Sequence, residues 1–216
     1  MLPVKYTKKT FSVLHSRAHT ILPSLVPTKS RAQEDMTSKS VRLIQTIIVR
    51  RERVLLGRWK KGPFEGRYSG FIGERIGEGT ERESVEEAAA RTVRDLSGVR
   101  IDPDCLEKRA RFEFHEVDPQ CPAAKHLGSS YDELQLFYDG DSVGVDFAAS
   151  LCNDMRETNE MIPEWFAIED IPYAIMPEDD KVWYPHFLAG ARLTGRFVFN
   201  GRALLEHSVE EVSEVP

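Results

Sequence analysis

Runs of apolar residues predict most of the strands of this chain. Aliphatic and β-branched residues fill 41–49 and 54–57, and the polar segment 50–53 between them predicts a β-hairpin. Further strand-like runs cover 109–115, 133–138 and 159–166. A C-terminal β-hairpin is predicted from Leu193 onward, with the favoured dipeptide Asn200-Gly201 as its turn. The polar, proline-bearing segment 118–132 is expected to be a loop.

One long stretch of helix-forming residues interrupts the strand pattern. It runs from Glu83 to Leu96, follows a loop rich in glycine, and stops before Gly98, a residue type that commonly lies just past a helix C-terminus. Shorter helices are expected over 146–156 and 183–188. The long helix and its loop form the stretch around which we expect the rest of the chain to be organised.

Charged residues recur every four positions along this helix: Glu83, Glu87, Arg91 and Asp95. Residues at this spacing share one face and can form ion pairs. Carboxylates beside a glycine-rich loop are also one way to hold Mg²⁺ against a phosphate chain, because hard cations prefer oxygen ligands. A purely structural alternative is that the helix only packs and that its acids are solvated.

Composition limits the classes of protein that fit. The chain has 216 residues, of which 41% are hydrophobic and 30% charged, as in a soluble protein with one core plus tails. The net charge of −6 argues against binding to nucleic-acid polymers, and no apolar run is long enough to cross a membrane. Cys105, Cys121 and Cys152 lack the spacing of a zinc knuckle or a disulfide framework.

The N-terminal segment differs from the rest because no acid precedes Glu34, while lysine, arginine and hydroxyl residues are frequent. This composition fits a mitochondrial transit peptide, and it fits a disordered basic tail equally well. Met36 could start a cytosolic form, so we expect the protein in the mitochondrial matrix or the cytoplasm. The expected organisation is a leader or tail over 1–38, an ordered domain over 39–206 and a frayed acidic tail over 207–216.

The helix and its loop resemble the Nudix box. The residues that match this pattern are Gly77, Glu83, Arg91, Val93, Gly98 and Val99. The resemblance implies the α/β class, as an α/β/α sandwich with a mixed β-sheet, and an Mg²⁺- or Mn²⁺-dependent hydrolase. It implies a catalytic group of Glu83, Arg91 and Asp95, and a metal site built from Gly73, Glu87, Asp95 and Glu160.

The box departs from the family pattern at three positions. Thr92 and Leu96 stand where the family has glutamates, and Asp95 is a shortened acid. A metal site that loses carboxylate ligands is weakened, so we expect weakened metal binding and a partly lost catalytic box. Thr80-Glu81-Arg82 looks inserted, and Glu78 or Glu81 could supply replacement ligands, a hypothesis that rests on the insertion alone.

A second resemblance narrows the subfamily. The segment from Val54 to Phe71 is similar to the 8-oxo-dGTP diphosphatases, the MutT homologues that hydrolyse oxidised purine nucleoside triphosphates. Phe64 (or Pro63) stands where that subfamily has a purine-stacking Phe, and Ser69 where it has a base-reading Asn. Serine offers a single hydroxyl in place of an amide, so the base specificity is expected to differ.

The run from Met176 to Pro185 resembles the subfamily's base-binding segment. Asp179 and Asp180 match its paired aspartates and Trp183 matches its second Trp, while the stacking Trp is replaced by Pro177 or, with a shift, by Met176. The structural alternative is that the two aspartates are only an N-cap pair of the following helix.

Three functions therefore remain open at the level of sequence. The first is a Nudix-type hydrolase that releases pyrophosphate from oxidised purine nucleoside triphosphates. The second is an inactive Nudix module that binds a nucleotide or serves as a subunit of a protein assembly. The third is a purely structural helix. We expect a small-molecule nucleotide as partner, no nucleic-acid polymer and no membrane, and a monomer, with a protein partner left open.

Overall fold

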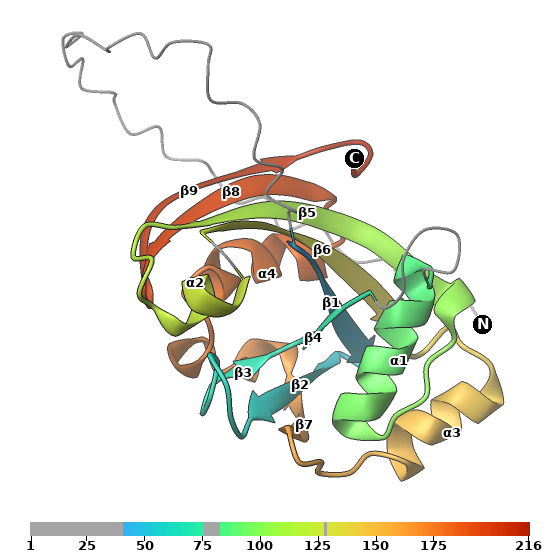
Figure 1. Ribbon diagram of the computed structural model, residues 1–216. Coiled ribbons are helices and arrows are strands. Elements are labelled where there is room, and N and C mark those ends of the chain that lie inside the picture. The colour runs from blue at the N-terminus through green and yellow to red at the C-terminus, as the bar shows by residue number, and fades with distance from the viewer. Residues whose placement is uncertain (1–40, 76–82, 128) are drawn as a thin grey trace, which may run out of the picture. The chain divides into compact units, whose positions relative to one another are not determined.

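A computed structural model describes residues 41–75, 83–127 and 129–216, whose helices and strands are shown in Figure 1. The predicted leader over 1–38 and the predicted insertion at Thr80-Glu81-Arg82, with Gly77, Gly79, Glu78 and Glu81, lie outside these residues. In the part of the chain that is described, no helix has the length and apolar character needed to span a membrane.

The described residues form a mixed β-sheet around strand β1 (Val41–Arg50). β1 pairs in parallel with β6 (Ser130–Asp139) and antiparallel with both β2 (Arg53–Trp59) and β4 (Phe71–Glu74). The order along the sheet is β3-β2-β1-β6-β5-β8-β9, with β7 paired to β2. The remaining strands are β3 (Tyr68–Ser69), β5 (Leu106–Glu116), β7 (Met161–Ala167), β8 (Leu193–Asn200) and β9 (Ala203–Glu211).

Helices cover both faces of the sheet because successive strand residues point to opposite sides. Ile48 belongs to an apolar cluster with Val93 of α1 (Val85–Ser97) and Leu151 of α3 (Val145–Asn153). Its neighbour Ile47 belongs to the other cluster, with Trp183 of α4 (Asp180–Leu188). The predicted α/β/α sandwich with a mixed sheet is therefore confirmed. Short 3₁₀ turns complete the chain at Pro103–Cys105, Ile168–Asp170 and Tyr173–Ile175.

Both predicted hairpins are present. The β1–β2 turn places Arg51 and Glu52 at φ angles of 50° and 57°, and Gly201 has a φ of 64° in the β8–β9 turn. Positive φ at the centre of a tight hairpin matches the twist of the strands that flank it.

Two expectations about irregular segments are wrong. The predicted loop 118–132 contains helix α2 (Pro122–Leu127) and the start of β6. The acidic tail is not frayed from Glu206 onward, because β9 continues to Glu211, which pairs with Leu193 of β8. Backbone pairing along a partner strand holds residues whose own sequence carries no apolar pattern.

Candidate functional site

A cavity opens on the face of the sheet that carries α4. Its volume, including the solvent-open entrance, is about 640 Å³. It is lined by Gln45 of β1, Phe64 and Arg67 before β3, Ile72 of β4, Phe114, His115 and Glu116 of β5, Tyr131 and Glu133 of β6, Pro177, Asp179 and Asp180 at the start of α4, and Phe199, Gly201 and Arg202 of the β8–β9 hairpin.

Asp179 and Asp180 form one wall of this cavity, and both are buried, with exposed fractions of 5% and 2%. Asp179 occupies the N-cap position of α4, yet its side chain caps no backbone N–H. Its Oδ2 instead accepts a hydrogen bond of 3.1 Å from Nε1 of Trp183. Oδ2 of Asp180 has no hydrogen-bond partner among the described residues. The two carboxyl groups are therefore placed to meet a ligand, which the helix-capping alternative does not explain.

The protonation of this pair is set mainly by burial, because a low-dielectric surrounding disfavours the charged form. Burial raises the pKa of Asp179 to about 6. The pKa of Asp180 lies well above its ordinary value, because of burial and then of the neighbouring Asp179 charge. Arg67 acts in the opposite direction on both groups, but its positive charge does not cancel the effect of burial.

The floor of the cavity is a polar network on β1 and β6. Glu133 is buried, and its Oε1 accepts a hydrogen bond of 2.6 Å from Nε2 of Gln135. The amide of Gln45 satisfies both of its ends when its oxygen accepts from the Gly70 N–H at 3.2 Å. In that orientation its nitrogen donates to Oε1 of Glu133 at 3.2 Å and to Oε1 of Gln135 at 2.5 Å. Burial raises the pKa of Glu133 to about 8, against the smaller effect of the Gln135 hydrogen bond.

Aromatic rings supply the apolar part of the cavity. Phe64 lies at its edge, with its ring centroid 6.3 Å from that of Trp59. Phe114 and Tyr131 stack on each other across β5 and β6, with centroids 5.1 Å apart and planes at 8°. Flat rings beside convergent polar groups are a common design of sites for small aromatic ligands.

Three of the predicted base-binding residues line the cavity, namely Phe64, Asp179 and Asp180. Trp183 does not reach it, because its ring is packed in the core beneath Asp179 and its indole N–H holds that carboxylate. Met176 is likewise buried in the core cluster, and its neighbour Pro177 lines the cavity instead.

Ser69 also lies away from the cavity walls. It is fully buried in β3, where its hydroxyl accepts a hydrogen bond of 2.8 Å from Nε1 of Trp59 and donates one of 2.7 Å to the Gly70 carbonyl. These two bonds use the hydroxyl inside the strand, so Ser69 has no free donor to offer a base.

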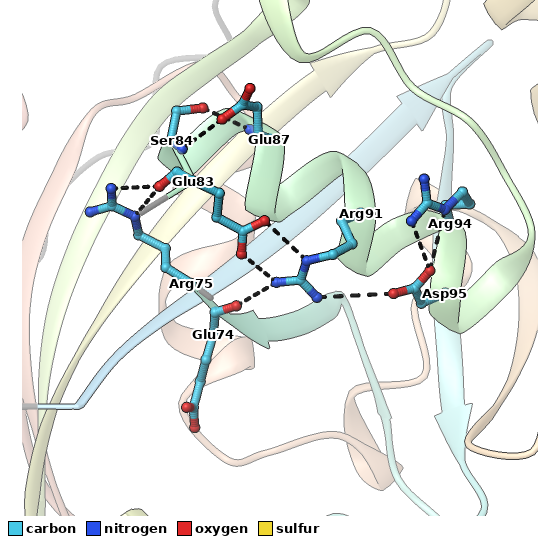
Figure 2. Close-up of polar contacts among 8 residues, drawn as sticks. All are labelled: Glu74, Arg75, Glu83, Ser84, Glu87, Arg91, Arg94 and Asp95. Atoms are coloured by element: carbon cyan, nitrogen blue, oxygen red, sulfur yellow. Dashed lines mark hydrogen bonds and ion pairs between the residues drawn. The ribbon is translucent and has the colours of Figure 1, made fainter. Parts of the chain in front are cut away.

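The predicted catalytic residues Glu83, Arg91 and Asp95 are brought together along α1 and the segment just before it, as Figure 2 shows. The Glu83 carboxylate accepts hydrogen bonds from Nε and a terminal nitrogen of Arg91, at 3.1 and 2.7 Å. Arg91 also donates to the Glu74 carbonyl at 2.7 Å and lies 4.0 Å from Asp95. Hydrogen bonding to Glu83 raises the pKa of Arg91. Arg75 adds two bonds to the Glu83 carbonyl, at 2.9 and 2.6 Å, so this group ties the start of α1 to the end of β4.

The predicted metal ligands are engaged with other partners. Glu87 completes a capping box with Ser84, accepting from its backbone N–H at 2.8 Å. Asp95 lies 3.3 Å from Arg94, and Glu160 forms an ion pair of 2.7 Å with Lys61. Within the described ranges, no three His, Cys, Asp or Glu side chains are grouped closely enough to hold a metal ion.

The two substituted positions of the box point into the body of the protein. Thr92 is 6% exposed, and a Cβ added to Gly73 would meet its hydroxyl oxygen at 2.2 Å. Leu96 is 8% exposed and belongs to the apolar cluster under α1. Gly73 is thus needed for close packing of β4 against α1. The described residues therefore do not fit the divalent metal ion that the resemblance implies.

Sequence reasoning missed the polar floor and the cavity's basic residues. Gln45 interrupts an otherwise apolar strand, and Glu133 and Gln135 alternate with leucines, a pattern that gives polar residues on one face of a strand. Only the pairing of Gln45 with Gln135 across β1 and β6 shows that these faces meet. His115 of β5 also lines the cavity.

The chain is similar in sequence to known proteins over most of its length. No protein-family model matches the chain. A Danio rerio protein named oxidized purine nucleoside triphosphate hydrolase is 32% identical over 180 residues, which are 83% of this chain and 99% of the relative. The Mus musculus protein of the same name is 30% identical over 167 residues, 77% of this chain and 92% of the relative.

Solved structures show the same fold. A MutT protein of Bacillus halodurans superposes with a TM-score of 0.60 at 20% identity, over 79% of this chain and 97% of that one. The Nudix domain of Shewanella oneidensis NrtR, solved with ADP ribose, gives a TM-score of 0.51 at 12% identity, over 72% and 93% of the two chains. With relatives of this identity matched over nearly their whole length, the chain belongs to the Nudix family, among its MutT-like members.

Proposed function

We propose that this chain binds an oxidised purine nucleoside triphosphate with its base in the cavity, and acts on it as a Nudix-type hydrolase that releases pyrophosphate. The observation that carries the proposal is the pair of buried carboxyl groups, Asp179 and Asp180, on the wall of a cavity edged by Phe64. A purine edge presents hydrogen-bonding groups in one plane, and its ring offers two faces to an aromatic side chain. The names of the relatives add independent support for this substrate class.

The groups in the cavity would recognise the base and exclude water from its edge. Asp180 has an unpartnered oxygen to offer, and Asp179 is held in one orientation by Trp183. Arg67 and Arg202 lie on the same cavity and bring positive charge that favours an anionic ligand. The base would thus be bound by a preformed set of side chains, which costs little conformational entropy on binding.

Hydrolysis would have to proceed with a Nudix box that lacks two of its glutamates, at Thr92 and Leu96. Nudix hydrolases generally use divalent metal ions, and a bound metal would screen the phosphate charge. The described residues do not fit such an ion, since Thr92 and Leu96 are packed inward and the nearby acids are paired with bases or caps. Catalysis would therefore depend on replacement ligands such as Glu78 or Glu81.

The same observation favours a second candidate, a Nudix module that binds a purine nucleotide without cutting it. The inward packing of Thr92 and Leu96 is the specific reason, because a leucine in the core cannot ligate a cation and the neutral Thr92 hydroxyl, packed against Gly73, is a weaker ligand than a carboxylate. Both candidates share the base cavity and differ only in turnover.

One experiment separates them. Binding and pyrophosphate release would be measured for 8-oxo-dGTP, 2-oxo-dATP, dGTP and dATP with Mg²⁺ or Mn²⁺, for the natural chain, for Asp179→Asn/Asp180→Asn, and for Asp146→Asn as a control on the exposed start of α3. Metal-dependent release that is lost in Asp179→Asn/Asp180→Asn supports the hydrolase, and a Glu78→Ala/Glu81→Ala variant then tests the replacement ligands. Binding without release supports the second candidate. Binding of none of the four nucleotides would overturn both.

A further inference from the structure

The cavity contains a third acidic side chain that the proposed recognition of the base has not used. Glu133 projects from β6 into the same space as Asp179 and Asp180, and it is buried, with an exposed fraction of 6%. Its charge interacts with those of both aspartates, and all three side chains line the same cavity. A ligand edge that enters the cavity would lie between β6 and the start of α4.

The network behind Glu133 fixes which of its oxygens a ligand can reach. Oε1 is occupied, since it accepts from Gln135 at 2.6 Å and from the Gln45 amide at 3.2 Å. Oε2 makes no hydrogen bond within the described part of the chain. Side chains whose hydrogen-bond partners lie behind them hold one orientation, as a specificity-determining group requires.

Electrostatics decides whether Oε2 donates or accepts. Three ionised carboxylates in one buried cavity would repel one another, and Arg67 is the cation that acts on the two aspartates. Groups in this situation share protons, so that at least one stays neutral. Arg67 is not among the groups that shift the pKa of Glu133. A neutral Glu133 presents an O–H donor, while each aspartate, protonated or ionised, keeps at least one oxygen that accepts.

We propose that Glu133, held by Gln45 and Gln135, is a specificity-determining residue that donates a hydrogen bond to a base carbonyl, so that the cavity selects 2-amino-6-oxopurines. In such a base the 6-oxo group lies next to the N1–H and 2-amino donors, which would face Asp179 and Asp180. This assignment rests on the proposed function, since it requires that the base occupies this cavity. Ser69, the residue predicted from the sequence to set base specificity, has its hydroxyl engaged within β3.

The test uses two ligands that differ at the 6-position and at N1. The 2′-deoxynucleoside monophosphates of guanine and of 2,6-diaminopurine both carry the 2-amino group. The second replaces the carbonyl by an amino group that cannot accept from Glu133, and its N1 carries no hydrogen, so the effect of Glu133 is read from how its variants change the ratio of the two affinities. Their affinities would be measured by calorimetry at neutral pH for the natural chain, Glu133→Gln, Glu133→Met and Glu210→Gln, the last being an exposed control on β9. Monophosphates are used because they carry the base and cannot release pyrophosphate.

The natural chain and the control should bind the guanine nucleotide at least about tenfold more tightly, because a donor facing an amino group leaves both unpaired. Glu133→Gln should keep this ratio within about threefold, since its amide also offers a donor once its oxygen accepts from Gln45 and Gln135. Glu133→Met should lower the ratio by more than about threefold, and the ratio that remains measures the change at N1.

Two outcomes would overturn the assignment, and they differ from failure of the proposed function. If 8-oxo-dGTP and dGTP bind but the natural chain does not distinguish the two monophosphates, Glu133 does not read the base. The same conclusion follows if Glu133→Met keeps the full ratio. If no nucleotide binds, triphosphates included, the proposed function itself falls and takes this assignment with it.

Discussion

Two acidic regions of this protein use the same chemical group in opposite ways. In the cavity beside α4, Glu133, Asp179 and Asp180 are buried and have few cationic partners, so their pKa values are raised. On α1 and just before it, Asp95 and Glu83 lie beside arginines, and Glu87 is used in capping. Carboxyl groups left without counter-charges are available for a ligand, whereas carboxylates already in ion pairs stabilise the fold. The difference teaches that an acidic motif indicates chemistry only after its partners are known.

The largest expected effect is a change in the pH dependence of stability when Glu133 is replaced. Its pKa of about 8 lies above the ordinary value of 4.5, so between these values the folded state binds more protons than the unfolded state. The stabilisation that protonated Glu133 contributes is thus fully present below pH 4.5 and is lost as the pH rises to 8. Glu133→Gln has no carboxyl group to ionise at this position and should not lose this stabilisation. The unfolding free energy of Glu133→Gln minus that of the natural chain should therefore increase by roughly 4 kcal/mol as the pH rises across this range.

Urea unfolding of the two proteins at several pH values measures this difference. Glu210→Gln, which removes an exposed carboxylate from β9, is the matched control and should follow the natural chain. A difference between Glu133→Gln and the natural chain that stays constant with pH would show that Glu133 is ionised in the folded protein.

The next effect tests the inward side of α1. Leu96→Glu should lower the unfolding free energy by about 2–4 kcal/mol at neutral pH, because it places a carboxylate in an apolar cluster. Leu96→Met keeps the volume and should cost less than about 1.5 kcal/mol. Denaturant unfolding checks both values. A stable Leu96→Glu protein that gains further stability on adding Mg²⁺ would mean that α1 can turn this position toward a metal site.

A smaller effect is expected from the ion pair on the outer side of α1. Glu83→Gln removes the charge that accepts two bonds from Arg91, and it should cost about 1–2 kcal/mol. A double-mutant cycle with Arg91→Gln should give a coupling energy of about 1 kcal/mol. Independent, additive costs would contradict the bidentate pair that Figure 2 shows.

The smallest effect concerns Asp95, whose side chain is 52% exposed and lies beside two arginines. Surface pairs of this kind contribute little, so Asp95→Asn should change the unfolding free energy by less than about 0.5 kcal/mol. Its effect on pyrophosphate release is the informative measurement. Loss of release with unchanged stability would show that Asp95 acts in catalysis, whereas unchanged release would place it with the surface charges.

Local pattern was sufficient for much of the fold. The hairpin around 50–53, the helix that begins near Glu83 and ends before Gly98, and the Asn200-Gly201 turn each depend on neighbouring residues, and each is present. The motif around Asp179 and Asp180 could also be located, because its residues are close together in the chain. Local pattern failed for α2 and for the part of β9 beyond Glu206, where packing and strand pairing decide the structure.

By itself, then, the sequence determined most of the elements, their order and the residues of the two acidic motifs, since these follow from short-range geometry. Only the tertiary structure decided which acids are free to act. Ser69 and Trp183 match the base-binding pattern by position, but burial and hydrogen bonding turn them into supports. Glu133 lies in β6 and Asp179 at the start of α4, and only the folded protein brings them to one cavity, because side-chain burial and charge compensation depend on contacts between distant segments.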